Sequence, residues 1–438
     1  MRILLIAPLL IATAATAAPE TPAAKPPRTE APDPARLKAT VEKLVSFGTR
    51  NTLSSATDPV RGIGAARTWA ANALDQIGEK CGCLTVEKIA RDFTGPRAPN
   101  GVTVVDVLGV QHGRDPNRVI IIGAHIDSRG SDTLDVTKDA PGANDDGSGV
   151  ALVLEAARIL SAEKFEATIV YAIFSGEEQG LWGGQLLAET AKARGWDVSA
   201  MLNNDIVGNT VGQNGIRVAD RVRVFSEGIR ASEDIKDQLA RRGNGGEDDG
   251  PSRALAKTID RVAATIPGGL DVFVDRRPDR FQRGGDHEPF LRLGYPAVRF
   301  SVAAENWTQQ HQDIRTENGI DYGDTVDKMD FPYLAKVAAI NIAAIRQLAS
   351  APAAPQDVTI DGALSYDTTV KWQAAPGAAR YRLRWRRTDS ADWTGSRDVI
   401  GTQAVLKNVL IDDYLFSVSS LSASGAESIP VLAGPAPR

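Results

Sequence analysis

Apolar runs alternate with amphipathic stretches along the first two thirds of the chain, and this alternation predicts the fold. Residues 119–123 and 168–174 are rich in β-branched and aromatic side chains, as buried strands are, and 198–202 is a weaker candidate. Residues 149–162 and 181–193 between them have helical spacing. Strands that alternate with helices predict an α/β fold, with a mostly parallel mixed sheet covered by helices on both faces.

Similar patterns flank this central part. Asp33 and Pro34 are suited to begin a helix, and the long apolar helix at 333–348 closes the α/β domain. The remaining predicted elements are helices at 34–47, 62–77 and near Pro289, and strands at 272–274 and 297–302.

The pattern changes after a linker rich in Ala and Pro. Alternating polar and apolar residues at 369–372, 381–385 and 414–418 predict a small all-β sandwich, whose Trp, Tyr and Leu spacing resembles a fibronectin type III module. The expected organisation is therefore a signal peptide (1–17), a Pro/Ala-rich tether (18–34), the α/β domain (35–350), a linker (351–356) and the sandwich (357–438).

The first residues have the order of an export signal. Arg2 precedes the apolar run 3–11 and the small residues 12–18, so we expect cleavage after Ala17 and a periplasmic or secreted protein. The run is shorter than the roughly 20 residues that span a bilayer, so we expect no membrane span. In an oxidising compartment Cys81 and Cys83 are expected to form a structural disulfide or to remain two free thiols.

Composition narrows the possible partners. The chain is 42% hydrophobic and 24% charged, which is ordinary for a globular protein. Its formal net charge of −5 lacks the basic footprint of nucleic-acid binding, and we expect no nucleic-acid partner.

Acidic side chains and one imidazole follow the predicted strands. His125 and Asp127 come after the first strand, Glu177 and Glu178 after the second, and Asp205 after the third. The carboxyl ends of parallel strands meet at one crevice, so these groups are expected to converge there with the loop 142–149. Such a cluster favours a divalent metal; imidazole and carboxylate without thiolate suit Zn²⁺ best, with Mn²⁺ or Co²⁺ as possible substitutes.

Each residue also has a simpler interpretation. Asp145 and Asp146 could cap the following helix, Glu177 and Glu178 could be solvated, and Asp205 could be a turn residue. Their common placement at strand ends beside an imidazole favours the metal site over these separate explanations.

Four segments together resemble the zinc aminopeptidase family of di-zinc exopeptidases. They are His125-x-Asp127, Gly142-Ala-Asn-Asp-Asp-Gly-Ser-Gly149, Ser175-Gly-Glu-Glu-Gln-Gly-Leu181 and Asn204-Asp205. The resemblance covers about residues 35–350, and the family includes bacterial leucyl aminopeptidases and relatives such as glutamate carboxypeptidase and glutaminyl cyclase. Four motifs in the same order are a strong signal, whereas each alone is weak.

The resemblance implies two Zn²⁺ ions and a role for each residue. Asp145 is expected to bridge the ions, and Glu177 is expected to be the general base. Asp127 is expected to orient His125. The remaining metal ligands are expected to be His125 and Asp205 at one ion, and Glu178 and His311 at the other.

His311 is chosen because family members have a histidine shortly before a segment like Asp324-Thr-Val-Asp327. The competing residue is His287, which resembles a pocket-lining histidine of the family that is usually no ligand. Some relatives also have an oxyanion-stabilising tyrosine shortly before the segment that corresponds to Asp286-His287. Residues 281–285 contain no tyrosine, which leaves Tyr322 as a candidate.

These implications lead to an expected reaction. A water held by two zinc ions attacks the amino-terminal peptide bond of a peptide or protein, with Glu177 as base. The alternatives within the superfamily are a glutaminyl cyclase and a carboxypeptidase or dipeptidase, for which Arg129, Arg280 and Arg283 could bind a substrate carboxylate. A non-catalytic, metal-stabilised binding protein is the alternative from another class.

Overall fold

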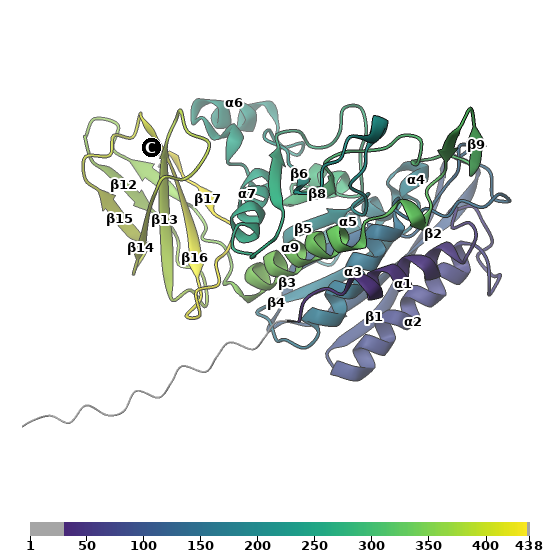
Figure 1. Ribbon diagram of the computed structural model, residues 1–438. Helices are drawn as coiled ribbons and strands as arrows, with labels where there is room; N and C mark the ends of the chain where they lie inside the picture. The colour runs from purple at the N-terminus through teal and green to yellow at the C-terminus, as the bar shows by residue number, and fades with distance from the viewer. Residues whose placement is uncertain (1–29, 436–438) are drawn as a thin grey trace, which may run out of the picture. The chain divides into compact units, whose positions relative to one another are not determined.

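The computed structural model describes residues 30–435, and its largest sheet is an eight-stranded mixed sheet with strands between residues 84 and 302 (Figure 1). Its order is β1-β2-β4-β3-β5-β8-β6-β7. The central neighbours β4, β3, β5 and β8 are parallel, so their carboxyl ends lie at one edge. The strands are β1 (Leu84–Gly95), β2 (Ala98–Gln111), β3 (Asp115–His125), β4 (Ala167–Phe174), β5 (Asp197–Asn204), β6 (Arg221–Phe225), β7 (Asp271–Asp275) and β8 (Ala297–Val302).

The expected α/β class is confirmed, and the predicted strands lie inside observed ones. Residues 119–123 form the middle of β3, and the weaker candidate 198–202 is the centre of β5. The sheet is less parallel at its margins, because β1 pairs with β2, β2 with β4, and β6 with β8 in antiparallel fashion.

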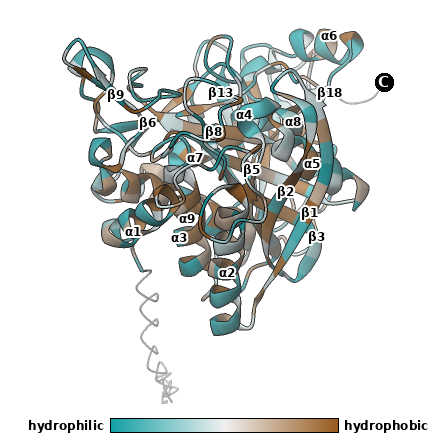
Figure 2. Cartoon of the chain, turned by 90° about the vertical axis from the view of Figure 1, so that its right-hand side faces the viewer, coloured by the Kyte–Doolittle hydropathy of each residue, from teal (hydrophilic) through white to brown (hydrophobic). Residues whose placement is uncertain are grey.

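Helices cover both faces of the sheet because the central strands are apolar on both sides. In β3, Ile120 and Ile122 pack into one core, and Val119 and Ile121 pack into the other. Figure 2 shows these strands in hydrophobic colours and the outward sides of the helices in hydrophilic ones. The first core is covered by α1 (Pro34–Val45), α2 (Ile63–Cys81), α3 (Gly147–Leu160), α7 (Pro251–Ala263) and α9 (Phe331–Ser350), and the second by α5 (Trp182–Ala193) and α8 (Glu288–Arg292).

Several elements lie where no element is predicted. In the β1–β2 hairpin, β1 buries only Leu84 and otherwise alternates partly buried and exposed positions, so it lacks the continuous apolar run of the central strands. The helix α6 (Ile235–Gly243) buries none of its residues, and its two large apolar side chains, Ile235 and Leu239, are exposed. The others include the helix α7 and the strand β6, α4 (Glu177–Gly180), the two-stranded hairpin β9 (Arg315–Glu317) and β10 (Ile320–Tyr322), and 3₁₀ turns at Gln213–Gly215, Gly246–Asp248 and Val326–Lys328.

Two four-stranded sheets, β15-β12-β11-β18 and β14-β13-β16-β17, make up the C-terminal part of the described chain. Their apolar sides share one core, to which Val370 and Leu406 contribute from the first sheet and Leu383 and Phe416 from the second. The fibronectin-like character and the domain boundaries stay predictions. The strands are β11 (Thr359–Asp361), β12 (Thr368–Lys371), β13 (Arg380–Arg387), β14 (Gly395–Val399), β15 (Gln403–Leu406), β16 (Tyr414–Leu421), β17 (Val431–Leu432) and β18 (Gly434–Pro435).

The signal peptide and most of the tether lie outside the described residues. Cys81 and Cys83 form a disulfide at the end of α2, which is one of the two expected states. Within residues 30–435, no helix combines the length and the apolar character needed to cross a bilayer.

Candidate metal centre

The carboxyl ends of three parallel strands deliver the predicted residues to one place. His125 is the last residue of β3, and Asp205 directly follows β5. Glu177 and Glu178 begin α4, three residues after β4 ends. Asp145 comes from the loop before α3, and His311 comes from the loop between β8 and β9.

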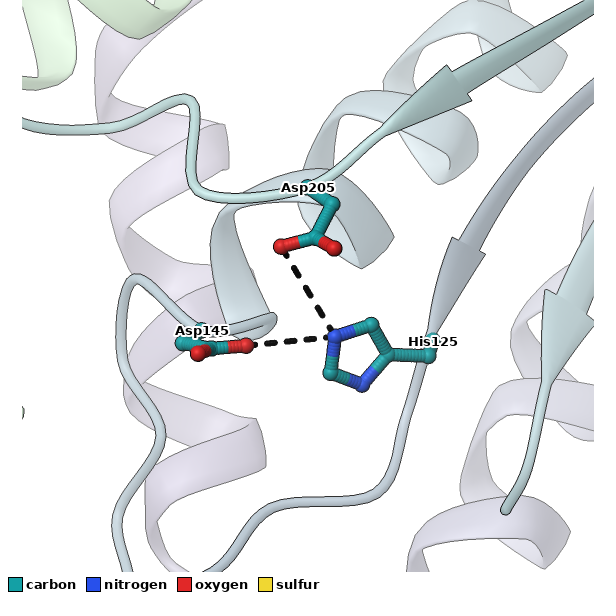
Figure 3. Close-up of side chains that lie close together, drawn as sticks. All are labelled: His125, Asp145 and Asp205. Carbon is teal, nitrogen blue, oxygen red and sulfur yellow. Dashed lines mark ion pairs between the residues drawn. The ribbon is translucent and has the colours of Figure 1, made fainter. Parts of the chain in front are cut away.

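The buried half-site consists of His125 and Asp205, with Asp145 beside them. Figure 3 shows both carboxylates pointing toward the same imidazole. His125 Nε2 is 3.1 Å from Asp145 Oδ1 and 3.9 Å from Asp205 Oδ1. All three side chains are buried, so little water is available to solvate their charges.

The outer half-site consists of Glu178 and His311. His311 Nε2 lies 3.0 Å from Asp145 Oδ2 and 3.1 Å from Glu178 Oε1. The His311 side chain is 27% exposed, whereas that of His125 is 1% exposed. The outer half-site therefore borders solvent.

Asp145 belongs to both half-sites, because one of its carboxylate oxygens faces each histidine. Two groups of candidate ligand atoms result, His125–Asp145–Asp205 and Asp145–Glu178–His311. A tetrahedral zinc ion with bonds near 2.1 Å separates its ligand atoms by about 3.4 Å. The observed separations fit that geometry closely in the outer half-site and more loosely for Asp205 in the buried one.

Unpartnered atoms support the same interpretation. His125 Nε2, Asp205 Oδ1 and Glu178 Oε1 are buried and make no hydrogen bond. Buried polar atoms in native proteins nearly always have a partner, and an unseen ion is one explanation for an exception. These three atoms belong to the residues of the two ligand groups, so the residues present fit a divalent metal ion.

The loop that carries Asp145 is fixed from both sides. The backbone N–H groups of Asn144 and Asp145 donate to Asp324 at 2.9 and 2.7 Å. Asp146 caps α3 by accepting from Gly149 N, and it also accepts from His125 N at 3.2 Å. The helix-capping alternative therefore applies to Asp146, which leaves the Asp145 carboxylate free to face the histidines.

Arg50 ties this loop to the end of β3. Its buried guanidinium donates to the carbonyl of Ile126 at 2.7 Å and to that of Gly142 at 2.9 Å. Burial lowers the pKa of Arg50 to about 10, and nearby carboxylates, Asp324 foremost, oppose that shift. Arg50 thus remains charged at neutral pH and neutralises part of the acidic cluster.

Asp127 supports two ligands, His125 and Glu178. The Nδ1 atom of His125 is 3.1 Å from the backbone carbonyl of Asp127 but 3.6 Å from its carboxylate, which is too long for a hydrogen bond. The carboxylate instead accepts from Thr52 Oγ1 at 2.9 Å and from Glu178 N at 3.1 Å. It therefore positions the start of α4, while its backbone carbonyl orients the imidazole.

Glu177 lies among other acidic groups. Burial, reinforced by the charges of Asp205 and Glu178, raises the pKa of Glu177 well above its ordinary value, although His125 opposes the shift. A carboxylate with a raised pKa holds a proton more readily than an ordinary one, which suits a group that must both accept and return a proton.

Opposite shifts affect the shared ligand and the outer histidine. Burial would raise the pKa of Asp145, but His125 and His311 outweigh it and hold that pKa well below the ordinary value. Burial lowers the pKa of His311, but Glu178 and Asp145 raise it to about 9. In the absence of metal, these groups therefore favour a charged pair.

The competing histidine does not join either group. His287 is fully buried, and its Nε2–H donates a hydrogen bond to the carbonyl oxygen of Pro278 at 2.7 Å. Tyr322, the oxyanion candidate, packs its ring 3.9 Å from the guanidinium of Arg315.

Three residues that support the ligands were not predicted. Arg299 is fully buried on β8, and its NH2 group lies 2.9 Å from Asp205 Oδ2. Asp324 and Arg50 act on the Asp145 loop from far along the chain. Only the Asp324 segment carried a signal, the motif used to select His311; a buried arginine looks like any other arginine in the sequence.

The fold and the two ligand groups together define a metallohydrolase of the α/β class. The model of peptidase family M28 matches residues 106–345. A protein of the fungus Pyrenophora teres f. teres, named a probable zinc metalloprotease, is 41% identical over 408 residues, covering 91% of this chain and 84% of the relative. The chain therefore belongs to peptidase family M28, a family of zinc metallopeptidases, and peptides are its substrates.

Solved structures share the fold at low sequence identity. A leucine aminopeptidase precursor from Bacteroides thetaiotaomicron has a TM-score of 0.53 and 18% identity, over 73% of this chain and 98% of that chain. A glutaminyl cyclase from Fimbriiglobus ruber also has a TM-score of 0.53, with 19% identity over 74% of this chain and 99% of that chain. The fold alone therefore does not separate these two activities.

Proposed function

We propose that the protein is an aminopeptidase that uses two zinc ions to hydrolyse the amino-terminal peptide bond of peptides. His125 and Asp205 would hold one ion, Glu178 and His311 the other, and Asp145 would bridge them. Zinc in such a site supplies a Lewis acid for the scissile carbonyl and an acidified water at neutral pH.

One observation carries this proposal: the two oxygens of Asp145 each face a different histidine, at 3.1 and 3.0 Å. A structural carboxylate needs only one partner, whereas a ligand shared between two ions needs an oxygen for each. Asp205 Oδ1 and Glu178 Oε1 are buried without a hydrogen bond, and each completes one of the two ligand groups.

Glu177 is the proposed proton carrier. Its carboxylate takes the proton of the attacking water and delivers a proton to the leaving amine, so that the acid and base steps use one residue. Bound cations would lower its pKa from the raised value of the metal-free protein and keep it ionised before attack. Asp127 holds the backbone of the adjacent Glu178 in place through its carboxylate.

The relatives support parts of this proposal. The name of the 41%-identical fungal relative supports zinc and peptide hydrolysis. The fold is compatible with amino-terminal hydrolysis, because a structure titled a leucine aminopeptidase precursor shares it, as does a glutaminyl cyclase.

A substrate panel tests the choice between activities. Chelator-treated protein is assayed with and without added zinc on aminoacyl chromogenic substrates, on the same substrates with blocked amino termini, and on peptides that begin with glutamine. We expect zinc-dependent release from free amino termini only. Preference for blocked substrates would contradict the aminopeptidase proposal, cyclisation of glutamine peptides would favour a glutaminyl cyclase, and no turnover with zinc restored would favour a binding protein.

We also propose that the protein functions in the periplasm or outside the cell. The order of residues 1–17 supports export, and the Cys81–Cys83 disulfide is suited to an oxidising compartment. Cell fractionation tests this: activity that remains cytoplasmic would contradict it.

A further inference from the structure

The turn that leads into Glu177 is held by buried side chains. Four successive backbone N–H groups, from Ser175 to Glu178, donate to them. The acceptors are, in order, Asp106 Oδ1, Thr52 Oγ1 and, for the last two groups, the carboxylate of Asp127, at 3.0, 3.1, 3.4 and 3.1 Å. Buried N–H groups need a partner, and in this turn side chains from three other parts of the chain supply it.

Ser175, the first residue of the turn, is fixed by its hydroxyl as well. Oγ donates to the carbonyl of Val105 on β2 at 2.8 Å, and it accepts from Arg67 Nε on α2 at 3.0 Å. Ser175 is 0% exposed and Arg67 is 6% exposed, so water does not compete for these bonds. A hydroxyl that both donates and accepts cannot rotate without breaking one of the two bonds. Arg67 therefore holds the turn from α2, opposite β2.

Arg67 also lies near the carboxylates that hold the turn. Burial lowers the pKa of Arg67, and the charges of Asp127 and Asp106 oppose that shift. A buried guanidinium is tolerated where anionic groups and hydrogen-bond acceptors surround it. One side chain thus bonds the turn directly and stands beside two of its three acceptor groups.

The carboxylate of Glu177 depends on this backbone for its position. Within residues 30–435, the hydrogen bonds of Glu177 are made by its N–H and its carbonyl. Glu178 differs, because Arg129 Nε donates to its Oε2 at 2.8 Å. The same arginine lies 2.7 Å from His311 Nδ1. A small shift of the turn should therefore displace Glu177 more than Glu178.

We propose that Arg67 is a positioning residue for Glu177: by holding Ser175, it keeps the general base within reach of the attacking water. This inference rests on the base assigned to Glu177 in the proposed function. Arg67 precedes residues 106–345, which the family model matches. A displacement of about 1 Å caused away from the chemistry can lower a rate about 10²-fold, so one buried hydrogen bond is enough to matter.

Two variants of the zinc-loaded, full-length protein remove the Arg67–Ser175 bond from its two ends. We expect Arg67→Met and Ser175→Ala each to lower kcat about 10–100-fold, with KM and zinc content unchanged. Steady-state kinetics on an aminoacyl chromogenic substrate, with metal analysis of the same samples, measures these values. Ser175→Ala is the smaller change and decides the question if Arg67→Met does not fold.

The same two changes in a Glu177→Gln background separate positioning of the base from a general structural effect. If Arg67 acts through Glu177, neither change should lower kcat further by more than about twofold once the base is an amide. Equal fold losses in the wild-type and Glu177→Gln backgrounds would show that Arg67 acts elsewhere and would overturn the inference.

Arg118→Met is the matched control. Arg118 is also buried, and its guanidinium donates to the carbonyls of Leu348 and Ala351, near the opposite end of β3 from His125. This variant should leave kcat unchanged, even where it lowers stability. A loss of kcat equal to that in Arg67→Met would overturn the inference.

The remaining outcomes distinguish this inference from the proposed function. Loss of zinc in both Arg67→Met and Ser175→Ala would assign their effect to a ligand and overturn the inference. Wild-type kcat in both, with a large loss in Glu177→Gln, would overturn it alone. Wild-type kcat in Glu177→Gln would overturn the proposed base, and this inference with it.

Discussion

The two half-sites differ in how their ligands are held. His125 and Asp205 stand at or directly after strand ends, and a fully buried arginine contacts Asp205. His311 lies in a long loop, adopts a positive φ of 53°, and contacts an arginine that is partly exposed. The sheet therefore positions the ligands of the buried half-site, whereas loops position those of the outer half-site.

The largest expected effect concerns Glu177, the proposed base, which is a ligand in neither half-site. Glu177→Gln should lower kcat by about 10²–10⁴-fold, because the amide cannot take the proton of the water. Zinc content should stay the same as in the wild type. Steady-state kinetics with metal analysis checks this, and Glu79→Gln, an exposed change on α2, is the control. Near-normal turnover would remove Glu177 from the mechanism.

The next prediction concerns Asp324. This residue fixes the loop that carries Asp145, the ligand common to both half-sites. Burial raises the pKa of Asp324 to about 7, although hydrogen bonds from the backbone of Asp145 and Asn144 oppose the shift. An acid with a raised pKa binds more protons when folded, so metal-free protein should lose stability as pH rises from about 4 to 7.

Asp324→Asn should remove that loss. The difference in free energy of unfolding between variant and wild type should therefore change in favour of the variant by up to about 4 kcal/mol between pH 4 and pH 8. Urea denaturation in the presence of chelator measures it. A difference that does not depend on pH would show that Asp324 is ionised throughout.

A third prediction tests the contrast in burial directly. In metal-free protein, His125→Ala should lower the free energy of unfolding by about 2–3 kcal/mol, because it leaves a cavity among buried carboxylates. His311→Ala should cost no more than about 0.5 kcal/mol in unfolding free energy, since its side chain borders solvent. Exposed His112→Ala serves as the control in the same denaturation series. Equal losses for His125 and His311 would break the comparison.

The smallest expected effect concerns Asp127. Its carboxylate accepts from Glu178 N, whereas its backbone carbonyl, which Asp127→Asn retains, accepts from His125. The variant should therefore weaken zinc at the outer half-site about tenfold and affect the buried one less. Stepwise zinc titration distinguishes the two. A loss confined to the buried half-site would instead support the role implied by the family resemblance, orientation of His125 by the carboxylate.

The same contrast explains what could be predicted from the sequence. Continuous apolar runs mark β3, β4 and β5, and the residues after them form the buried half-site, so strand periodicity alone located His125 and Asp205. His311 needed a resemblance, since no periodic element leads to it. Arg50, Arg129, Arg299 and Asp324 act through contacts between residues far apart in the sequence, and such pairings leave no local pattern.

A weak apolar pattern explains why two elements, β1 and α6, were not predicted. At the margin of the sheet, β1 buries only Leu84 and otherwise alternates partly buried and exposed positions, and α6 buries none of its residues. Neither element has the apolar surplus on which strand and helix assignments depend.

Arg50 has a consequence for how the molecule can be divided. The family model matches residues 106–345, which contain every proposed zinc ligand. Yet the guanidinium that joins the loops after His125 and before Asp145 comes from residue 50, and Thr52 beside it bonds Asp127. A fragment trimmed to the matched region would keep all the ligands and lose the brace that sets their spacing. Zinc retention by truncated chains would therefore report whether the amino-terminal segment is docked.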